Sequence, residues 1–267
     1  MPSPKSIILI LILALAIPLT AAPADEAVAL EAKLKETAET SSGGAALMLQ
    51  LINLYWADEQ VFGLIRTASK FSRSQPEHPR RAEMMLKLMD GYAITARHED
   101  VITTGRQFLE LFPGNPLSNE ARDRLATALE RTGRGTQAAT QRGDIWRNGG
   151  SVAEGLRSLQ LSMQANNGNA FKEATTLATE MVEKLPVDVT LTAVGFQGME
   201  AAERTEQWTE GLQLAKALLR RQAPLNELRQ SDLWYRSGRF ESRLGQHENA
   251  VESFRKALAP GRDDIHR

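Results

Sequence analysis

Apolar side chains recur along this chain at intervals of three and four residues, the spacing of one face of an α-helix. Between residues 152 and 185 they form two stripes separated by the polar segment 166–169. The first stripe is Val152, Leu156, Leu159 and Met163, and the second is Phe171, Ala174, Ala178, Met181 and Leu185. Residues 85–96 and 101–112 repeat this arrangement. Sustained period-two alternation is absent from the sequence, so the pattern predicts hairpins of two helices and no strands.

Two sets of residues indicate that the hairpins repeat at a fixed period. The first set is five prolines separated by 37, 73, 38 and 36 residues, where 73 is close to two periods: Pro76, Pro113, Pro186, Pro224 and Pro260. Proline lacks the N–H that a helix interior needs, so it marks a helix end. The second set predicts where each second helix crosses its partner: Leu64, Val101, Ala138, Ala174, Gly211 and Ala250. A recurring period of this length predicts a stack of helix pairs.

The segments between the stripes carry helix end signals. Pro116, Pro186 and Pro224 each stand two residues before a side chain that can cap the next helix, namely Ser118, Asp188 and Asn226. Gly133 and Gly245 fall where the short turn within a hairpin is expected. Glycine suits the left-handed conformation in which many helices end, because it has no Cβ.

The amino-acid composition excludes several classes of function. The 267 residues are 42% hydrophobic and 24% charged, with 32 basic and 33 acidic side chains and a net charge of −1. Because long basic runs are missing, a nucleic-acid partner is disfavoured. The chain has no cysteine, which excludes disulfides, thiolate metal ligands and a cysteine nucleophile.

The first 24 residues have the order of a secretory signal peptide. Lys5 precedes the apolar stretch 7–17, and Pro18 is followed by small residues ending in Ala22, Pro23 and Ala24. Eleven apolar residues are fewer than the roughly 20 that span a bilayer, so cleavage near Ala24 is favoured over a retained anchor. We therefore expect a periplasmic or secreted protein with no stable membrane span after cleavage.

The last repeat resembles the tetratricopeptide repeat (TPR). The residues that carry the resemblance are Trp234, Gly238, Gly245, Ala250, Phe254 and Ala257. The segment 107–116, followed by Asn119, Glu120 and Ala121, is similar to the TPR proteins of the bacterial cell envelope. The resemblance implies an all-α, right-handed α-solenoid superhelix of about six TPR-like helix-turn-helix repeats. The expected divisions are a signal peptide (1–24), a capping helix and linker (25–43), the solenoid (44–261) and a tail (262–267).

Candidate chemistry is sparse. The four histidines are isolated in sequence and are interpreted as exposed residues of turns or of the chain end. The trio His98, Glu99 and Asp100 is expected in a turn within a hairpin, where it caps a helix. Asp263, Asp264 and His266 lie in the tail, which is a poor scaffold for metal ligands. The sequence therefore predicts no enzyme, no cofactor and no metal.

The resemblance implies a groove lined by the first helix of each hairpin. The residues predicted to contact a partner are Leu86, Leu159, Met163, Phe196, Arg204, Tyr235, Arg239 and Arg243. Arginines could hold carboxylates of the partner, or could be solvated helix ends near C-terminal carbonyls. The predicted function is a non-catalytic protein-protein interaction scaffold that binds a peptide or helix. Two further hypotheses stay open: an accessory protein of polysaccharide export or peptidoglycan metabolism that binds wall carbohydrate, and self-association through the end of the stack.

Overall fold

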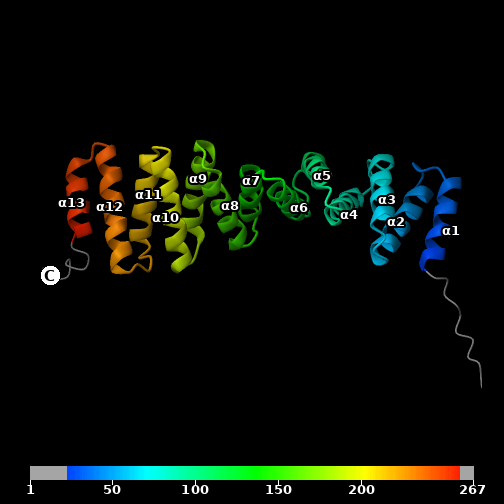
Figure 1. The fold of residues 1–267 in the computed structure, drawn as a ribbon, viewed down its shortest axis with the longest axis horizontal. Helices are drawn as coiled ribbons and strands as arrows, with labels where there is room; N and C mark the ends of the chain where they lie inside the picture. The colour runs from blue at the N-terminus through cyan, green and yellow to red at the C-terminus, as the bar shows by residue number, and fades with distance from the viewer. Residues whose placement is uncertain (1–22, 259–267) are drawn as a thin grey trace, which may run out of the picture. The chain divides into compact units, whose positions relative to one another are not determined.

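The computed structural model describes residues 23–258, which form thirteen α-helices and no strand (Figure 1). Most of the predicted signal peptide, Pro260 and the predicted tail 262–267 lie outside the described residues. The helices are α1 (Pro23–Glu36), α2 (Ser42–Ala57), α3 (Val61–Ser74), α4 (Arg81–Ile94), α5 (His98–Leu111), α6 (Ser118–Arg131), α7 (Gly135–Arg147), α8 (Val152–Ala165), α9 (Gly168–Lys184), α10 (Val189–Arg204), α11 (Trp208–Arg220), α12 (Glu227–Arg243) and α13 (His247–Leu258). No helix within 23–258 has both the length and the apolar composition needed to cross a bilayer.

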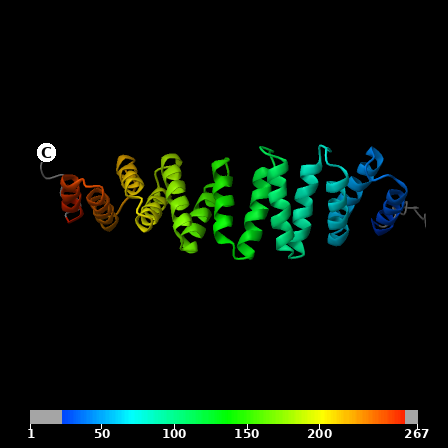
Figure 2. The same ribbon diagram turned by 90° about the horizontal axis from the view of Figure 1, so that it is seen from above.

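The chain divides into two compact units after His78. Unit 1 contains α1, α2 and α3, and in it α1 and α3 both pack on α2. Unit 2 contains α4 to α13, and each of its helices packs against its neighbours in sequence, so that the hairpins lie in a row (Figure 2). The six pairs from α2–α3 to α12–α13 are the six predicted hairpins. The prediction of an all-α stack of helix pairs is confirmed.

The six residues predicted to mark helix crossings are all buried on second helices. Gly211 shows why one of them is small. A Cβ added to Gly211 would lie 2.5 Å from the ring of Phe240, which belongs to α12 of the next hairpin. The close approach at Gly211 is therefore between hairpins, whereas the sequence argument placed it within one.

Two of the three predicted caps form as expected. The Asp188 carboxylate accepts hydrogen bonds from the N–H groups of Thr190 and Leu191, and the Asn226 side chain accepts one from Arg229. Ser118 instead is the first residue of α6, and Leu117 precedes it at the cap position without a side-chain hydrogen bond.

Each hairpin turns through one residue with a positive φ. Gly133 and Gly245 take this place as predicted, both with φ of 74°. The other four hairpins use Glu59, Ala96, Asn166 and Glu206, with φ between 48° and 57°. A residue with a Cβ is strained in this region, since the Cβ approaches the following carbonyl oxygen. The turn geometry is thus common to all six hairpins, although glycine is not.

Replacing Ala96 with glycine is expected to raise the free energy of unfolding by about 0.5–1 kcal/mol, because relief of strain exceeds the added entropy of the unfolded chain. Gly133→Ala is the matched reverse change, since a Cβ there would meet nothing within 4 Å. It should lower the free energy of unfolding by about 1 kcal/mol. Urea denaturation followed by circular dichroism measures both. Destabilisation by Ala96→Gly would contradict the strain argument.

Candidate functional site

Three of the residues predicted to contact a partner belong to the core of unit 2. Leu86, Leu159 and Phe196 are 5%, 0% and 6% exposed. The prediction that these three side chains contact a partner is wrong, because they are buried among the packed helices. Met163 is half-buried and also packs against the core.

Phe196 and Tyr235 show how the packing depends on the neighbouring hairpin. Both stand 15 residues before the crossing residue of their hairpin, Gly211 or Ala250. The guanidinium groups of Arg229 and Arg236, on α12 of the next hairpin, lie 4.7 and 6.0 Å from the Phe196 ring centroid. Tyr235 is half exposed, and its ring centroid lies 5.9 Å from that of Phe254. Of the predicted apolar contacts, Tyr235 is the one most accessible to a partner.

The predicted arginines lie at the surface, and two of them rest on aromatic rings of the preceding hairpin. The Arg204 guanidinium is 4.9 Å from the ring centroid of Phe171, and that of Arg243 is 5.4 Å from the ring centroid of Trp208. In both cases an arginine at the end of a first helix covers a ring at the start of the preceding hairpin's second helix. The contact recurs because the two arginines hold equivalent positions, seven residues before the crossing residue.

Arg131 holds the same position in the third hairpin, two hairpins before that of Arg204. It shares a cavity of about 400 Å³ with His98, which is the counterpart of Phe171 and Trp208. We call Arg131, Arg204 and Arg243 the arginine edge. Arg204 pairs with Glu200 at 2.7 Å. Arg131 and Arg243 make no ion pair with any residue in 23–258.

Arg239 is less available to a partner than Arg131 and Arg243 are. Its guanidinium lies 5.9 Å from the ring centroid of Tyr235 and 3.4 Å from a carboxylate oxygen of Glu203. Glu203 also pairs with Arg236 at 3.2 Å. Arg239 therefore positions the Tyr235 ring and has a carboxylate partner already.

Two members of the trio His98, Glu99 and Asp100 form ion pairs. His98, Glu99 and Asp100 form the first turn of α5, whereas the sequence placed them in the preceding turn. Glu99 pairs with Arg134 at 2.6 Å and Asp100 with Arg97 at 2.7 Å. Residues 23–258 contain no group of three or more metal-ligating side chains, and Asp263, Asp264 and His266 lie outside them.

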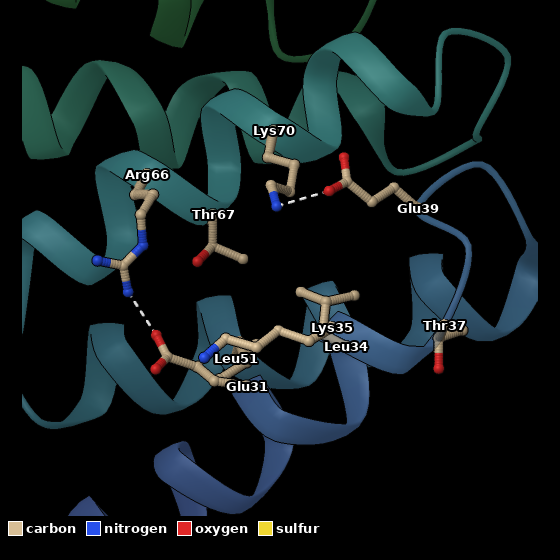
Figure 3. Close-up of a pocket in the computed structure, with 9 residues that line it drawn as sticks. All are labelled: Glu31, Leu34, Lys35, Thr37, Glu39, Leu51, Arg66, Thr67 and Lys70. Carbon is tan, nitrogen blue, oxygen red and sulfur yellow. Dashed lines mark hydrogen bonds and ion pairs between the residues drawn. The ribbon is translucent and has the colours of Figure 1, made fainter.

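The largest cavity that we describe lies in unit 1, between α1 and α3 (Figure 3). It has a volume of about 530 Å³ and Leu34, Leu51 and Thr67 among its lining residues. Glu31 pairs with Arg66 at one side, and Glu39 pairs with Lys70 at 2.7 Å on the other. Sequence reasoning missed this site because it considered only the faces of first helices.

Glu31 is held in its charged form. The Tyr55 hydroxyl donates a hydrogen bond to Glu31 at 2.6 Å. This bond is the largest cause of the lowered pKa of Glu31, and Arg66 lowers that pKa further against the effect of burial. Burial together with the same bond raises the pKa of Tyr55 to about 12.

Two smaller cavities in unit 2 are built in the same way. One of about 360 Å³ lies between α5 and α7, where Arg106 donates to Gln137. The other, of about 320 Å³, lies between α9 and α11, where Arg220 pairs with Glu183. Long polar side chains thus bridge furrows between successive second helices. The recurrence of such side chains on polar helix faces is the signal that could have indicated these furrows.

The sixth hairpin packs through the residues that carry the sequence resemblance. A Cβ added to Gly238 would lie 2.7 Å from the Phe254 ring, so glycine allows α12 and α13 to approach. Ala250 is buried, and Gly245 makes the left-handed turn between the two helices. The sixth hairpin therefore packs as its resemblance to the tetratricopeptide repeat implies.

The solved structures that match this chain include proteins described as having tetratricopeptide repeats or similar repeats. A tetratricopeptide repeat protein from Parabacteroides merdae is 13% identical, with a TM-score of 0.43 and coverage of 91% of this chain and 88% of that one. The apo form of RapI is 10% identical, with a TM-score of 0.40 and coverage of 88% and 89%. MamA from Desulfovibrio magneticus RS-1 is 14% identical, with a TM-score of 0.32 and coverage of 80% and 93%. No protein-family model and no curated protein matches the sequence.

Proposed function

We propose that this chain is a non-catalytic scaffold of the cell envelope that binds an acidic segment of a protein partner along the arginine edge of unit 2. The observation that carries the proposal is the equivalent placement of Arg131, Arg204 and Arg243. The three arginines stand at the same position of the third, fifth and sixth hairpins, so that an extended partner lying along unit 2 can reach all of them. A scaffold role also agrees with the two candidate carboxylates beside His98 being occupied by arginines.

Stacking prepares Arg204 and Arg243 for carboxylate recognition. A guanidinium that rests on a ring has fewer orientations to lose on binding, while the N–H groups at its edge stay free to donate. Arginine and carboxylate can then form two parallel hydrogen bonds. Arg243 combines this stacking with the absence of an ion pair within 23–258, and Tyr235 on the same helix adds an exposed apolar surface.

The envelope location rests on the leader. The charged residue Lys5, the apolar stretch 7–17 and the small residues up to Ala24 support export and cleavage. The partner should therefore be sought in the cell envelope.

A photoreactive amino acid at position 235 should crosslink the partner in the native envelope. The double substitution Arg131→Gln and Arg243→Gln is expected to reduce the yield at least about fivefold, because it removes two cations from the contact. Arg134→Gln is the matched control, since Arg134 lies near Arg131 but already pairs with Glu99. An unchanged yield, or a captured segment without acidic residues, would overturn the proposal. Recovery of wall carbohydrate in place of protein would favour the alternative function.

A further inference from the structure

We infer that the cavity between α1 and α3 binds a short peptide segment in which one acidic side chain stands between apolar ones. This site belongs to unit 1 and lies between α1 and α3, so it does not depend on the arginine edge of unit 2. Its lining is the basis of the inference (Figure 3).

The cavity opens between α1 and α3, both of which pack on α2. Ala27 and Leu30 of α1 are buried, and α1 packs on α2. The two helices that flank the cavity are joined by the Glu31–Arg66 pair, while Glu39 in the following linker reaches Lys70. Both ion pairs lie at the walls, and the space between them is open.

The linker that carries Glu39 is fixed in place. The Gln75 side-chain amide donates to the backbone oxygens of Glu39 and Ser41, at 2.7 and 3.2 Å. The Ser41 hydroxyl also accepts a hydrogen bond from the N–H of Gly44. The cavity wall is therefore preorganised, which reduces the conformational entropy lost when a ligand binds.

The charges of the lining favour a ligand with one negative charge. Lys35, Arg66 and Lys70 are opposed by two carboxylates, which leaves one positive charge in excess. Glu31 is occupied by Tyr55 and Arg66, while Lys35 makes no ion pair with any residue in 23–258. The two carboxylates at the walls would repel a ligand with several negative charges.

The position of Lys70 makes exchange of its partner feasible. Lys70 and Glu39 are 37% and 46% exposed, so their ion pair is screened by water. A carboxylate from a ligand can take the place of Glu39 beside Lys70, with Lys35 as a second cation. Lys70 would then pair with the ligand in place of Glu39, and the packing of the helices would not change.

The floor of the cavity explains why a peptide fits better than a bare anion. Leu34 and Leu51 are apolar, and Thr67 contributes a methyl group beside its hydroxyl. A volume of about 530 Å³ lies within the range of small-molecule sites and exceeds that of a single carboxylate. Apolar side chains on either side of the acidic one would cover this floor.

The test is an NMR titration of the full chain with acetyl-Leu-Glu-Leu-amide, observed at the amides of Leu51 and Thr67. The peptide should give saturable shifts, and acetyl-Leu-Gln-Leu-amide should bind at least about tenfold more weakly because it lacks the charge. The double substitution Lys35→Gln and Lys70→Gln should weaken the glutamate peptide by a similar factor. Lys33→Gln, which removes the same charge from α1 outside the cavity lining, should change binding less than about twofold.

Each alternative outcome has a defined meaning. Equal binding of the two peptides, or no saturable shift, would overturn the inference. Displacement of the peptide by an equal concentration of inorganic phosphate would also overturn it, because the site would then recognise any small anion. Since Lys35 and Lys70 are at the surface, circular dichroism of the variants should match that of the original chain. The Arg131 and Arg243 variants should bind the peptide normally, so this test and that of the proposed function can fail separately.

Discussion

Replacing Phe196 with alanine is expected to lower the free energy of unfolding by about 3–5 kcal/mol, whereas Tyr235→Ala should lower it by only about 1 kcal/mol. The two residues occupy equivalent positions in adjacent hairpins. Phe196 is 6% exposed, and Tyr235 is 50% exposed. Alanine at 196 leaves a cavity in the core. Alanine at 235 removes less buried surface, together with the contact between Tyr235 and Phe254.

The measurement is urea denaturation of each single variant, with amide hydrogen exchange to locate the loss. Local exchange is needed because repeat arrays can unfold in parts, so one midpoint does not describe the whole chain. Faster exchange should appear first in α10 and the helices around it. Equal stability losses for the two variants would show that the difference in burial does not control packing at this position.

The pair Phe196 and Tyr235 also shows how far the sequence determines the groove. The resemblance placed both residues on the groove face of a first helix, and they do hold the same register. Periodicity reports which residues share a face, but the exposure of that face depends on the side chains that the next hairpin brings over it. For Phe196 these are Arg229 and Arg236, whose rotamers no local pattern specifies.

The turns and cavities differ in how well sequence signals predict them. The hairpin lengths follow from prolines, caps and apolar stripes, all of which are local. The left-handed residue was recognised only where it is glycine, as at Gly133 and Gly245, and was missed at Ala96 and Glu206. The cavity between α1 and α3 depends on contacts across 35 residues, such as that between Glu31 and Arg66, so a local pattern could not reveal it.

The strongest electrostatic effect is expected at Arg142, which joins three helices of unit 2. Its guanidinium contacts Asp123 and Glu130 of α6 at 2.5 and 3.2 Å and Glu154 of α8 at 3.0 Å. Its side chain is only 11% exposed. Arg157 makes a second contact with Glu130 at 2.5 Å. The network thus concentrates three carboxylates around one buried cation.

Arg142→Ala should lower the free energy of unfolding by about 2–3 kcal/mol, because it leaves these carboxylates without their shared cation. The figure lies below the 3–5 kcal/mol typical of a broken buried pair, since Glu130 and Glu154 are 19% and 25% exposed and water partly replaces the lost contacts. Arg134→Ala is the control and should cost less than about 1 kcal/mol, because its pair with Glu99 is exposed. Urea denaturation at neutral pH compares the two variants, and equal costs would contradict a special role for the network.

The same network predicts how the cost of Arg142→Ala changes with pH. Burial raises the pKa of Glu130, but hydrogen bonds from Arg157 and Arg142 outweigh it and place the pKa below the ordinary value of 4.5. A carboxyl whose pKa is lower in the folded state contributes its full stability above the unfolded value and loses it as the pH falls through the folded value. The difference between Arg142→Ala and the original chain should therefore be largest at neutral pH and narrow below pH 4.5. A difference that stays the same in acid would mean that Arg142 stabilises the fold by packing, with its charge contributing little.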